Sequence, residues 1–210
     1  MRSRRIPWLI IGTHIVGMMP LVLLLGEYWR VGLMPDPVGI AMQRTGRYAL
    51  LFLLLSLIPT ILYTALGLPH LIRVRRLLGL YAFFYASLHF LIYIGLDYAF
   101  NLPLLAHSLP DAMYVLVGLA AFLLLVPLAI TSTDGWVRRL GRRWKQLHRL
   151  VYPAAALVIW HYAWVFKELR TGPVAAGMIL ILLFVLRLPP VRDWLTSRRA
   201  KLDARSRPHD

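Results

Sequence analysis

Six apolar stretches of membrane-spanning length dominate this sequence of 210 residues, and short charged segments separate them. A helix needs about 20 apolar residues to cross the hydrocarbon layer of a bilayer, although about 17 suffice with tilting or local thinning. Hydrophobic residues make up 59% of the chain and charged residues only 16%, which is less charge than a soluble domain of this length carries. We therefore expect an all-α polytopic membrane protein with six transmembrane helices, at residues 7–26, 48–67, 77–96, 112–131, 150–166 and 173–186.

The distribution of Lys and Arg predicts how this bundle is oriented. Of the 24 basic residues, 19 fall in the two tails and in the second and fourth connections, whereas five fall in the other three connections. Basic residues concentrate on the cytoplasmic side of membrane proteins. We therefore expect both termini in the cytoplasm, with residues 1–196 forming the bundle and residues 197–210 forming a basic, disordered cytoplasmic tail.

Several classes of function are excluded or disfavoured by composition. The sequence contains no cysteine, which rules out disulfides, cysteine-ligated iron–sulfur clusters and covalently attached haem. The net charge of +15 is explained by membrane topology, since the arginines lie between apolar runs, and nucleic acid is not an expected partner. No glycine-rich nucleotide motif and no hydrolase motif occurs. Any haem in this protein must be held non-covalently, by side chains such as histidine.

Histidines occur inside three of the apolar stretches, at His14, His89 and His161, and ionisable residues there are rare and usually functional. His89 lies in the stretch 77–96, and His161 lies in the stretch 150–166. Because both stretches enter the membrane from the cytoplasmic side, these two histidines should lie at similar depth, toward the outer leaflet, on parallel helices. Two axial ligands of one haem iron require that arrangement, so we predict a haem between His89 and His161. The alternative is a pair of hydrogen-bonded histidines that only pack helices together.

His148 lies thirteen residues before His161, at the cytoplasmic end of the same stretch. A helix would separate the two by about 20 Å along its axis. His148 is either an ordinary interfacial histidine or part of a second cofactor site. In the second case it ligates another haem together with His14, the most plausible intramembrane partner, or it serves a flavin.

Two groups of arginines are candidates for binding acidic groups of a cofactor. Arg44 and Arg47 flank the expected outer start of the second helix, where an arginine fork would suit haem propionates, although interfacial anchoring explains them equally well. Arg142 and Arg143, near Lys145, lie in the basic fourth connection. Their positive charge can simply set the membrane topology. Alternatively, they contact a flavin phosphate or a protein partner.

The sequence also resembles the ferric-reductase-like transmembrane domain that NADPH oxidases share. It is closer still to the haem-binding membrane subunits of bacterial periplasmic methionine sulfoxide reductase systems. The stretches that carry this resemblance are Thr-Gly-Arg at 45–47, Arg-Arg-Leu-Leu-Gly-Leu at 75–80, Leu-His at 88–89, Thr-Ser-Thr at 131–133, and Leu-Gly-Arg-Arg-Trp-Lys-Gln-Leu-His at 140–148. The resemblance covers nearly the whole chain. The oxidases have two histidines on the third span, where this chain has one.

The resemblance implies a b-type haem, an FMN, a location in the bacterial inner membrane, and His89, His148 and His161 as the functional histidines. It also implies an electron donor that is a quinol or a cytoplasmic flavin reductase, and a periplasmic acceptor that is a molybdopterin-containing sulfoxide reductase which repairs oxidised methionine. We therefore expect an electron-transfer subunit rather than a catalytic one. The rival interpretation is a small transporter in which intramembrane histidines relay protons.

Overall fold

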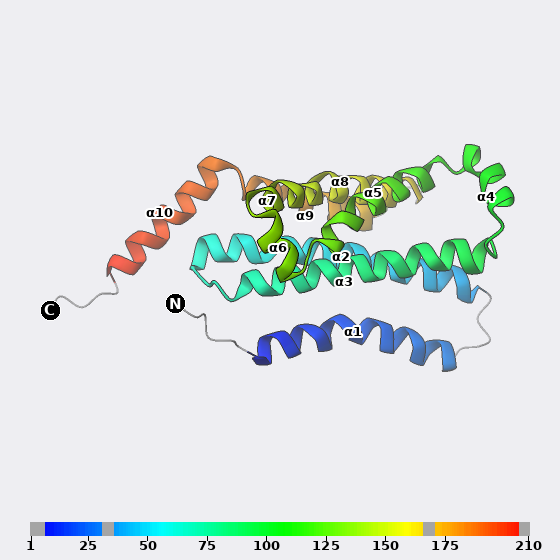
Figure 1. Ribbon diagram of the computed structural model, residues 1–210, viewed down its shortest axis with the longest axis horizontal. Coiled ribbons are helices and arrows are strands. Elements are labelled where there is room, and N and C mark those ends of the chain that lie inside the picture. Colours follow the sequence, from blue (N-terminus) through cyan, green and yellow to red (C-terminus); the bar gives the residue numbers. More distant parts are fainter. Residues whose placement is uncertain (1–6, 31–35, 166–170, 206–210) are drawn as a thin grey trace.

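The computed structural model describes residues 7–30, 36–165 and 171–205, and within these ranges the chain forms helices and turns but no strand (Figure 1). The long helices are α1 (Pro7–Arg30), α2 (Pro37–Leu66), α3 (Leu71–Leu91), α5 (Met113–Ile130), α8 (Val151–Val165), α9 (Thr171–Val185) and α10 (Pro189–Arg205). Shorter elements are the π-helix η1 (Ile92–Asp97), α4 (Leu102–Ser108), the 3₁₀-helix η2 (Leu109–Asp111), α6 (Asp134–Leu140), α7 (Arg142–Leu147) and the 3₁₀-helix η3 (His148–Leu150).

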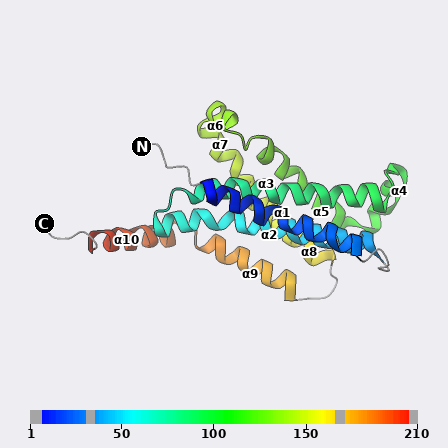
Figure 2. The same cartoon turned by 90° about the horizontal axis from the view of Figure 1, so that it is seen from below.

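A central pair, α2 and α3, organises the bundle. These helices pack against each other more extensively than any other two elements, and α5 with α8 forms the second closest pair. Helix α1 packs on α3 on one side of the central pair, whereas α5, α8 and α9 lie on the other side (Figures 1 and 2). The short α4 lies at one end of the bundle, and the turn from α2 to α3 lies at the other.

The all-helical, multi-pass membrane character is confirmed, whereas the number of six spans is not. Four helices are long and apolar enough to cross a membrane, namely Trp8–Glu27, Pro37–Leu66, Leu71–Asp97 and Met113–Ile130. A fifth span results if α9 and α10, which meet at a bend of 66°, are counted together. Helix α8 has 15 residues in the described part of the chain, fewer than the roughly 17 that a span needs.

Helix α2 starts eleven residues earlier than the sequence predicted, at Pro37 instead of residue 48. A polar run from Gln43 to Arg47 interrupts its apolar sequence, which is why the residues before Tyr48 were assigned to a connection. Asp36 caps this helix, since its side chain accepts a hydrogen bond of 2.8 Å from the Gly39 amide, and Pro37 follows at the position where proline is best tolerated. Arg44 and Arg47 therefore lie inside α2 rather than at its start.

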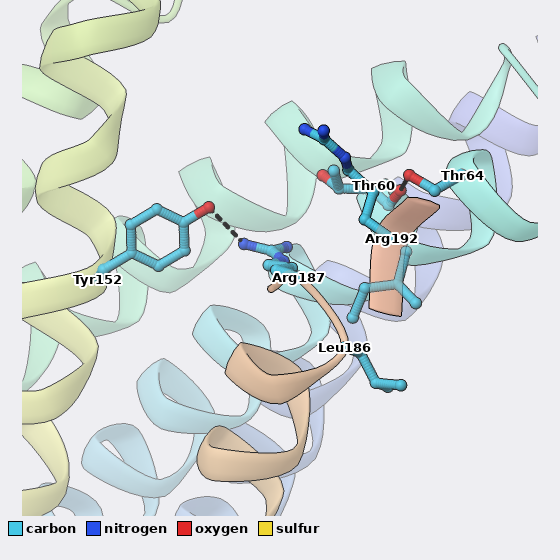
Figure 3. A pocket seen from close by; sticks show the side chains of 7 residues that line it. Thr60, Thr64, Tyr152, Leu186, Arg187 and Arg192 are labelled. Atoms are coloured by element: carbon cyan, nitrogen blue, oxygen red, sulfur yellow. Dashed lines mark hydrogen bonds between the residues drawn. The ribbon is translucent and has the colours of Figure 1, made fainter. Parts of the chain in front are cut away.

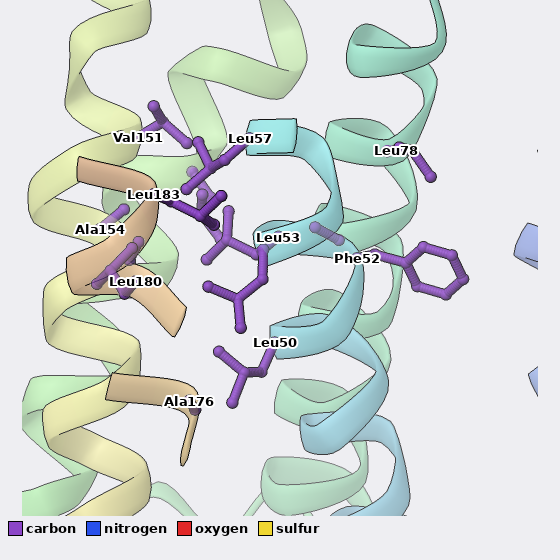
Figure 4. Packing of buried hydrophobic residues seen from close by; sticks show 14 of the residues in the cluster. Leu50, Phe52, Leu53, Leu57, Leu78, Val151, Ala154, Ala176, Leu180 and Leu183 are labelled. Carbon is purple, nitrogen blue, oxygen red and sulfur yellow. The ribbon is translucent and has the colours of Figure 1, made fainter. Parts of the chain in front are cut away.

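Leucines and small residues fill the interior between the two helix pairs. Leu53 and Leu57 of α2 are almost fully buried, and Ala154 and Ala155 of α8 have no exposed surface (Figure 4). Small residues let membrane helices approach closely, which compensates for the weak hydrophobic driving force between helices in lipid. Many large apolar side chains on α1 and α9 remain exposed, as expected of a surface that faces acyl chains.

Tyr85 of α3 attaches α1 to the bundle. Its hydroxyl donates to the Gly17 carbonyl at 2.7 Å and accepts from the Leu21 amide at 3.1 Å. An unbroken helix would join those two main-chain groups directly, so the hydroxyl is inserted into the hydrogen-bond ladder of α1, next to Pro20. Gly17 also allows close approach, because a β-carbon there would lie 2.3 Å from the Tyr81 ring.

The chain after α9 is more ordered than the sequence predicted. Helix α10 continues to Arg205, so the prediction of disorder from Ser197 is wrong for residues 197–205. The helix is basic and leaves the bundle at the end where α2 terminates, with an Arg199 nitrogen 3.4 Å from the Tyr63 carbonyl. This placement suits an interfacial helix that follows α9.

Candidate haem-ligating histidines

His89 and His161 face each other inside the bundle, as predicted. His89 lies near the end of α3 and His161 near the end of α8, and their ring centroids are 6.3 Å apart, with ring planes at 78°. An imidazole nitrogen binds a first-row metal at about 2.0–2.1 Å, so two rings that share one metal have centroids about 6 Å apart. The observed separation would allow both imidazoles to bind the same metal ion.

Main-chain carbonyl groups orient both rings. Nδ1 of His89 lies 2.8 Å from the Met42 carbonyl of α2, and Nδ1 of His161 lies 2.8 Å from the Tyr114 carbonyl of α5. A carbonyl only accepts hydrogen bonds, so each Nδ1 must carry the proton, and each Nε2 then keeps a free lone pair. Metal-binding histidines typically show this arrangement, in which a hydrogen bond to the far nitrogen fixes the tautomer and the ring orientation.

Two glycines make room for the histidine rings. A β-carbon on Gly46 of α2 would lie 3.1 Å from Nδ1 of His89, and one on Gly118 of α5 would lie 2.9 Å from Nδ1 of His161. Gly46 was part of a stretch that carried the resemblance, but Gly118 was not recognised from the sequence. The sequence did contain a signal for it, because a glycine inside an apolar helix lowers helix stability and usually marks a point of close packing.

This donor set fits haem iron and does not suit a bare metal ion. In the described part of the chain, no three His, Cys, Asp or Glu side chains gather as metal ligands would. Two imidazoles alone leave the coordination of a metal ion incomplete, whereas haem brings four nitrogens of its own and needs only axial ligands. His89 and His161 are the residues that would hold it.

His148 shows part of the same pattern at the other end of α8. Its Nδ1 lies 3.1 Å from the Trp144 carbonyl, and its ring stacks on the Trp144 indole with centroids 3.8 Å apart. Its Nε2 is buried and meets no partner at hydrogen-bond geometry among the described residues, although the Leu128 main chain and the charge of Arg75 both act on the ring. A buried, unpartnered ring nitrogen is the feature that a missing ligand would satisfy.

The structure does not bring His14 to His148. His14 lies on α1, with Nδ1 2.8 Å from the Tyr81 hydroxyl and its ring edge-on to Tyr81. Helix α1 packs on α3, on the far side of the α2–α3 pair from α8. The structure therefore gives no support to a haem held by these two histidines, and the observed partner of His14 is Tyr81.

The four candidate arginines have different surroundings. Arg44 forms an ion pair with Glu27 of α1, which offsets its charge, whereas Arg47 lies one turn further along α2. Arg142 and Arg143 lie exposed on α7. The adjoining α6 is tied to the start of α3 by an ion pair of 2.6 Å between Arg76 and Asp134, and this partner lowers the pKa of the Asp134 carboxyl. None of these four arginines contacts the ring of His89 or His161.

Comparison with known proteins agrees with this geometry. The family of ferric reductase like transmembrane components matches residues 45–159, a range that includes His89 and His148 and ends two residues before His161. The chain is 43% identical to a protein of Xanthomonas euvesicatoria pv. vesicatoria over 178 residues, covering 81% of this chain and 82% of that protein. That relative is named protein-methionine-sulfoxide reductase heme-binding subunit MsrQ.

Other bacterial strains and species contain proteins of the same name at similar identity. The MsrQ protein of Xanthomonas oryzae pv. oryzae is 41% identical over 198 residues, covering 90% of this chain and 88% of that protein. The MsrQ protein of Rhodospirillum rubrum is 42% identical over 191 residues, covering 90% of this chain and 92% of that protein. The similarity therefore extends over nearly the full length of these relatives.

Proposed function

Because the chain belongs to the MsrQ heme-binding subunits of the ferric reductase-like transmembrane family, we propose that it is a b-type cytochrome which supplies electrons to a methionine sulfoxide reductase. Its partner in this proposal is a periplasmic, molybdopterin-containing catalytic subunit. The electron donor is a cytoplasmic flavin reductase or a quinol. The chain thereby supports the repair of oxidised methionine in periplasmic proteins without itself carrying the catalytic site.

The facing pair of His89 and His161 is the observation that carries the proposal. A haem held by His89 and His161 would supply one-electron redox chemistry, and with both histidines bound it would offer no open position for oxygen. The protein's contribution is to fix both ligands before haem binds, through the Met42 and Tyr114 carbonyl groups. Fixed ligands keep the geometry similar in both oxidation states, which lowers the reorganisation that electron transfer requires.

His148 is proposed as a ligand of a second haem near the opposite end of α8. The buried, unpartnered Nε2 and the carbonyl-bound Nδ1 support ligation. Thirteen residues of helix place this site about 20 Å along the axis from His161. An FMN remains a prediction from the family resemblance alone, and its phosphate would meet Arg142 and Arg143 on α7.

The orientation proposed is that of both termini in the cytoplasm of a bacterial inner membrane. The excess of basic residues at the end that contains α6, α7 and the start of α8 supports it. In this orientation His148 lies on the side of the donor, and the pair His89 and His161 lies toward the periplasmic partner. Electrons would then cross the membrane along α8.

The proposal is tested with purified protein in detergent. A reducible haem spectrum, followed by reoxidation on addition of the catalytic subunit with methionine sulfoxide, is the expected result. Reoxidation should fail with His89→Ala, while an exposed-site variant, His107→Ala, should behave as the unaltered protein does. A protein without haem would favour the proton-relay transporter instead. A haem that the catalytic subunit does not oxidise would contradict the proposed partner.

A further inference from the structure

A small cavity lies where α9 turns into α10, at the arginine-rich end of the bundle (Figure 3). Its volume is about 190 Å³, and its lining comes from α2, α8, the α9–α10 turn and the start of α10: Thr60, Ile61, Thr64, Tyr152, Leu186, Arg187 and Arg192. Thr60 is fourteen residues beyond Gly46 on α2, which corresponds to about 21 Å along the helix. The cavity is therefore separate from the site between His89 and His161.

Two buried polar atoms in the cavity wall have no hydrogen-bond partner among the described residues: Nε of Arg187 and Oγ1 of Thr60. The other nitrogens of Arg187 are used, since Nη1 donates to the Tyr152 hydroxyl at 2.8 Å and Nη2 donates to the Leu57 carbonyl. These contacts hold the guanidinium in place, as Figure 3 shows for Tyr152. Buried polar groups are nearly always paired in native proteins, so both atoms call for an acceptor.

Positive charge at this place is not balanced by the chain itself. Arg187 lies close enough to Arg75 of α3 for the two charges to repel. Within the described ranges no carboxylate pairs with either of them, and the one acidic neighbour, Asp193, pairs with Arg192 at 3.1 Å. Two half-buried arginines without an acidic partner lower the stability of the fold unless a bound anion balances their charge.

Size and surroundings identify the class of anion. A volume of about 190 Å³ is below the roughly 300–1,000 Å³ of pockets that enclose drug-sized ligands, so the cavity suits a phosphate group and not a macrocycle. The neighbouring turns expose Leu62 and Leu66 of α2 and Leu182 and Val185 of α9. Apolar surface beside a basic pocket at the membrane boundary is the arrangement that recognises anionic phospholipids.

We propose that this cavity binds the phosphate of an anionic phospholipid such as phosphatidylglycerol. The phosphate oxygens accept hydrogen bonds from Arg187 Nε and Thr60 Oγ1, and Arg75 adds positive charge. The acyl chains lie against the exposed leucines of α2 and α9. Because α10 begins three residues after Leu186, a lipid held here also fixes the bend between α9 and α10.

Lipid binding to the full-length, delipidated protein in detergent tests this proposal by native mass spectrometry. Phosphatidylglycerol is compared with phosphatidylcholine, which carries the same phosphodiester without net charge, and with inorganic phosphate. Thr60→Val should weaken phosphatidylglycerol binding about fivefold and Arg187→Gln about tenfold or more, the losses expected for a neutral and a charge-assisted hydrogen bond. Arg198→Gln is the matched control, because Arg198 is an exposed arginine on α10 outside the cavity.

Three outcomes would overturn the proposal. Equal weakening by Arg198→Gln would indicate attraction to the basic surface in general. Unchanged binding in both cavity variants would show that the cavity is not the binding site. Thr60→Val tests this even if Arg187→Gln destabilises the fold. If inorganic phosphate bound as tightly as the lipid, the ligand of this site would be a soluble phosphate and not a phospholipid. A preference for phosphatidylglycerol that is lost only in the cavity variants is the result we expect.

Discussion

Gly118 of α5 lies directly against the His161 ring, so that a β-carbon at this position would lie 2.9 Å from Nδ1 and 3.0 Å from Cε1. The same turn of α5 provides the Tyr114 carbonyl that orients the ring. One short segment of α5 therefore gives His161 both its space and its hydrogen bond. A change in the distance between α5 and α8 should disturb this side of the site as much as a change of His161 itself.

Gly118→Ala should displace the His161 ring, because the three atoms nearest to the added methyl group all belong to that ring. Overpacking of this kind costs about 1–3 kcal/mol, and we expect a loss of haem affinity in that range. Haem titration of the purified apoprotein measures it. Gly79→Ala is the control, since nothing lies within 4 Å of a β-carbon at that position of α3. Equal effects of the two substitutions would contradict the special role of Gly118.

Tyr85→Phe should loosen α1. Without the hydroxyl, the hydrogen bonds that link α3 to the Gly17 carbonyl and the Leu21 amide of α1 are lost, and each contributes about 0.5–1.5 kcal/mol to stability. The thermal unfolding midpoint in detergent should fall accordingly. Tyr63→Phe, which alters an exposed tyrosine of α2, should leave the midpoint unchanged. A wild-type midpoint for Tyr85→Phe would show that the inserted hydroxyl contributes nothing to the attachment of α1.

His148→Ala and His14→Ala should differ in haem content. If His148 ligates a second haem, its loss lowers the haem-to-protein ratio by about half and leaves the haem at His89 and His161 in place. His14→Ala should keep the full ratio, because its ring contacts Tyr81 and not the cofactor region. An unchanged ratio in His148→Ala would instead favour the flavin role for this end of the bundle.

The exposed Asp134 carboxyl should titrate below its ordinary value of 3.8, because the hydrogen bond and the charge of Arg76 favour the ionised form. A lowered pKa means that the ion pair joining α6 to α3 is present above pH 3.8 and is lost as the pH falls through the lowered value. Carbon-13 NMR of labelled aspartate measures this pKa. Arg76→Gln should raise it toward the ordinary value, and no change on that substitution would contradict the assigned cause.

The sequence predicted the depth of the haem site but not its detail. Counting residues from the basic connections sufficed to place His89 and His161 at one level. The role of the Met42 carbonyl could not be predicted, because the polar residues around Arg44 made this part of α2 look like a connection. In the structure Arg44 pairs with Glu27 of α1, and the Met42 carbonyl accepts from His89. The neighbour of His14 could not be predicted for a different reason: depth follows from chain length, whereas the helix that α1 packs against depends on contacts such as that of Tyr85 with Gly17.

Membrane orientation is open to a separate measurement. Reporter fusions after Asp97 and after Arg205 should lie on opposite sides, the first in the periplasm and the second in the cytoplasm, because the basic connections hold the second end inside. A periplasmic signal from the fusion after α10 would reverse the proposed direction of electron transfer, although it would leave the histidine pair untouched.

The axial ligation of the haem iron tests the central claim most directly. Electron paramagnetic resonance of the oxidised protein should give a low-spin signal of two imidazole ligands. The separate substitutions His89→Ala and His161→Ala should each abolish that signal, and His107→Ala should retain it. Persistence of the same low-spin signal in His89→Ala or in His161→Ala would contradict the account.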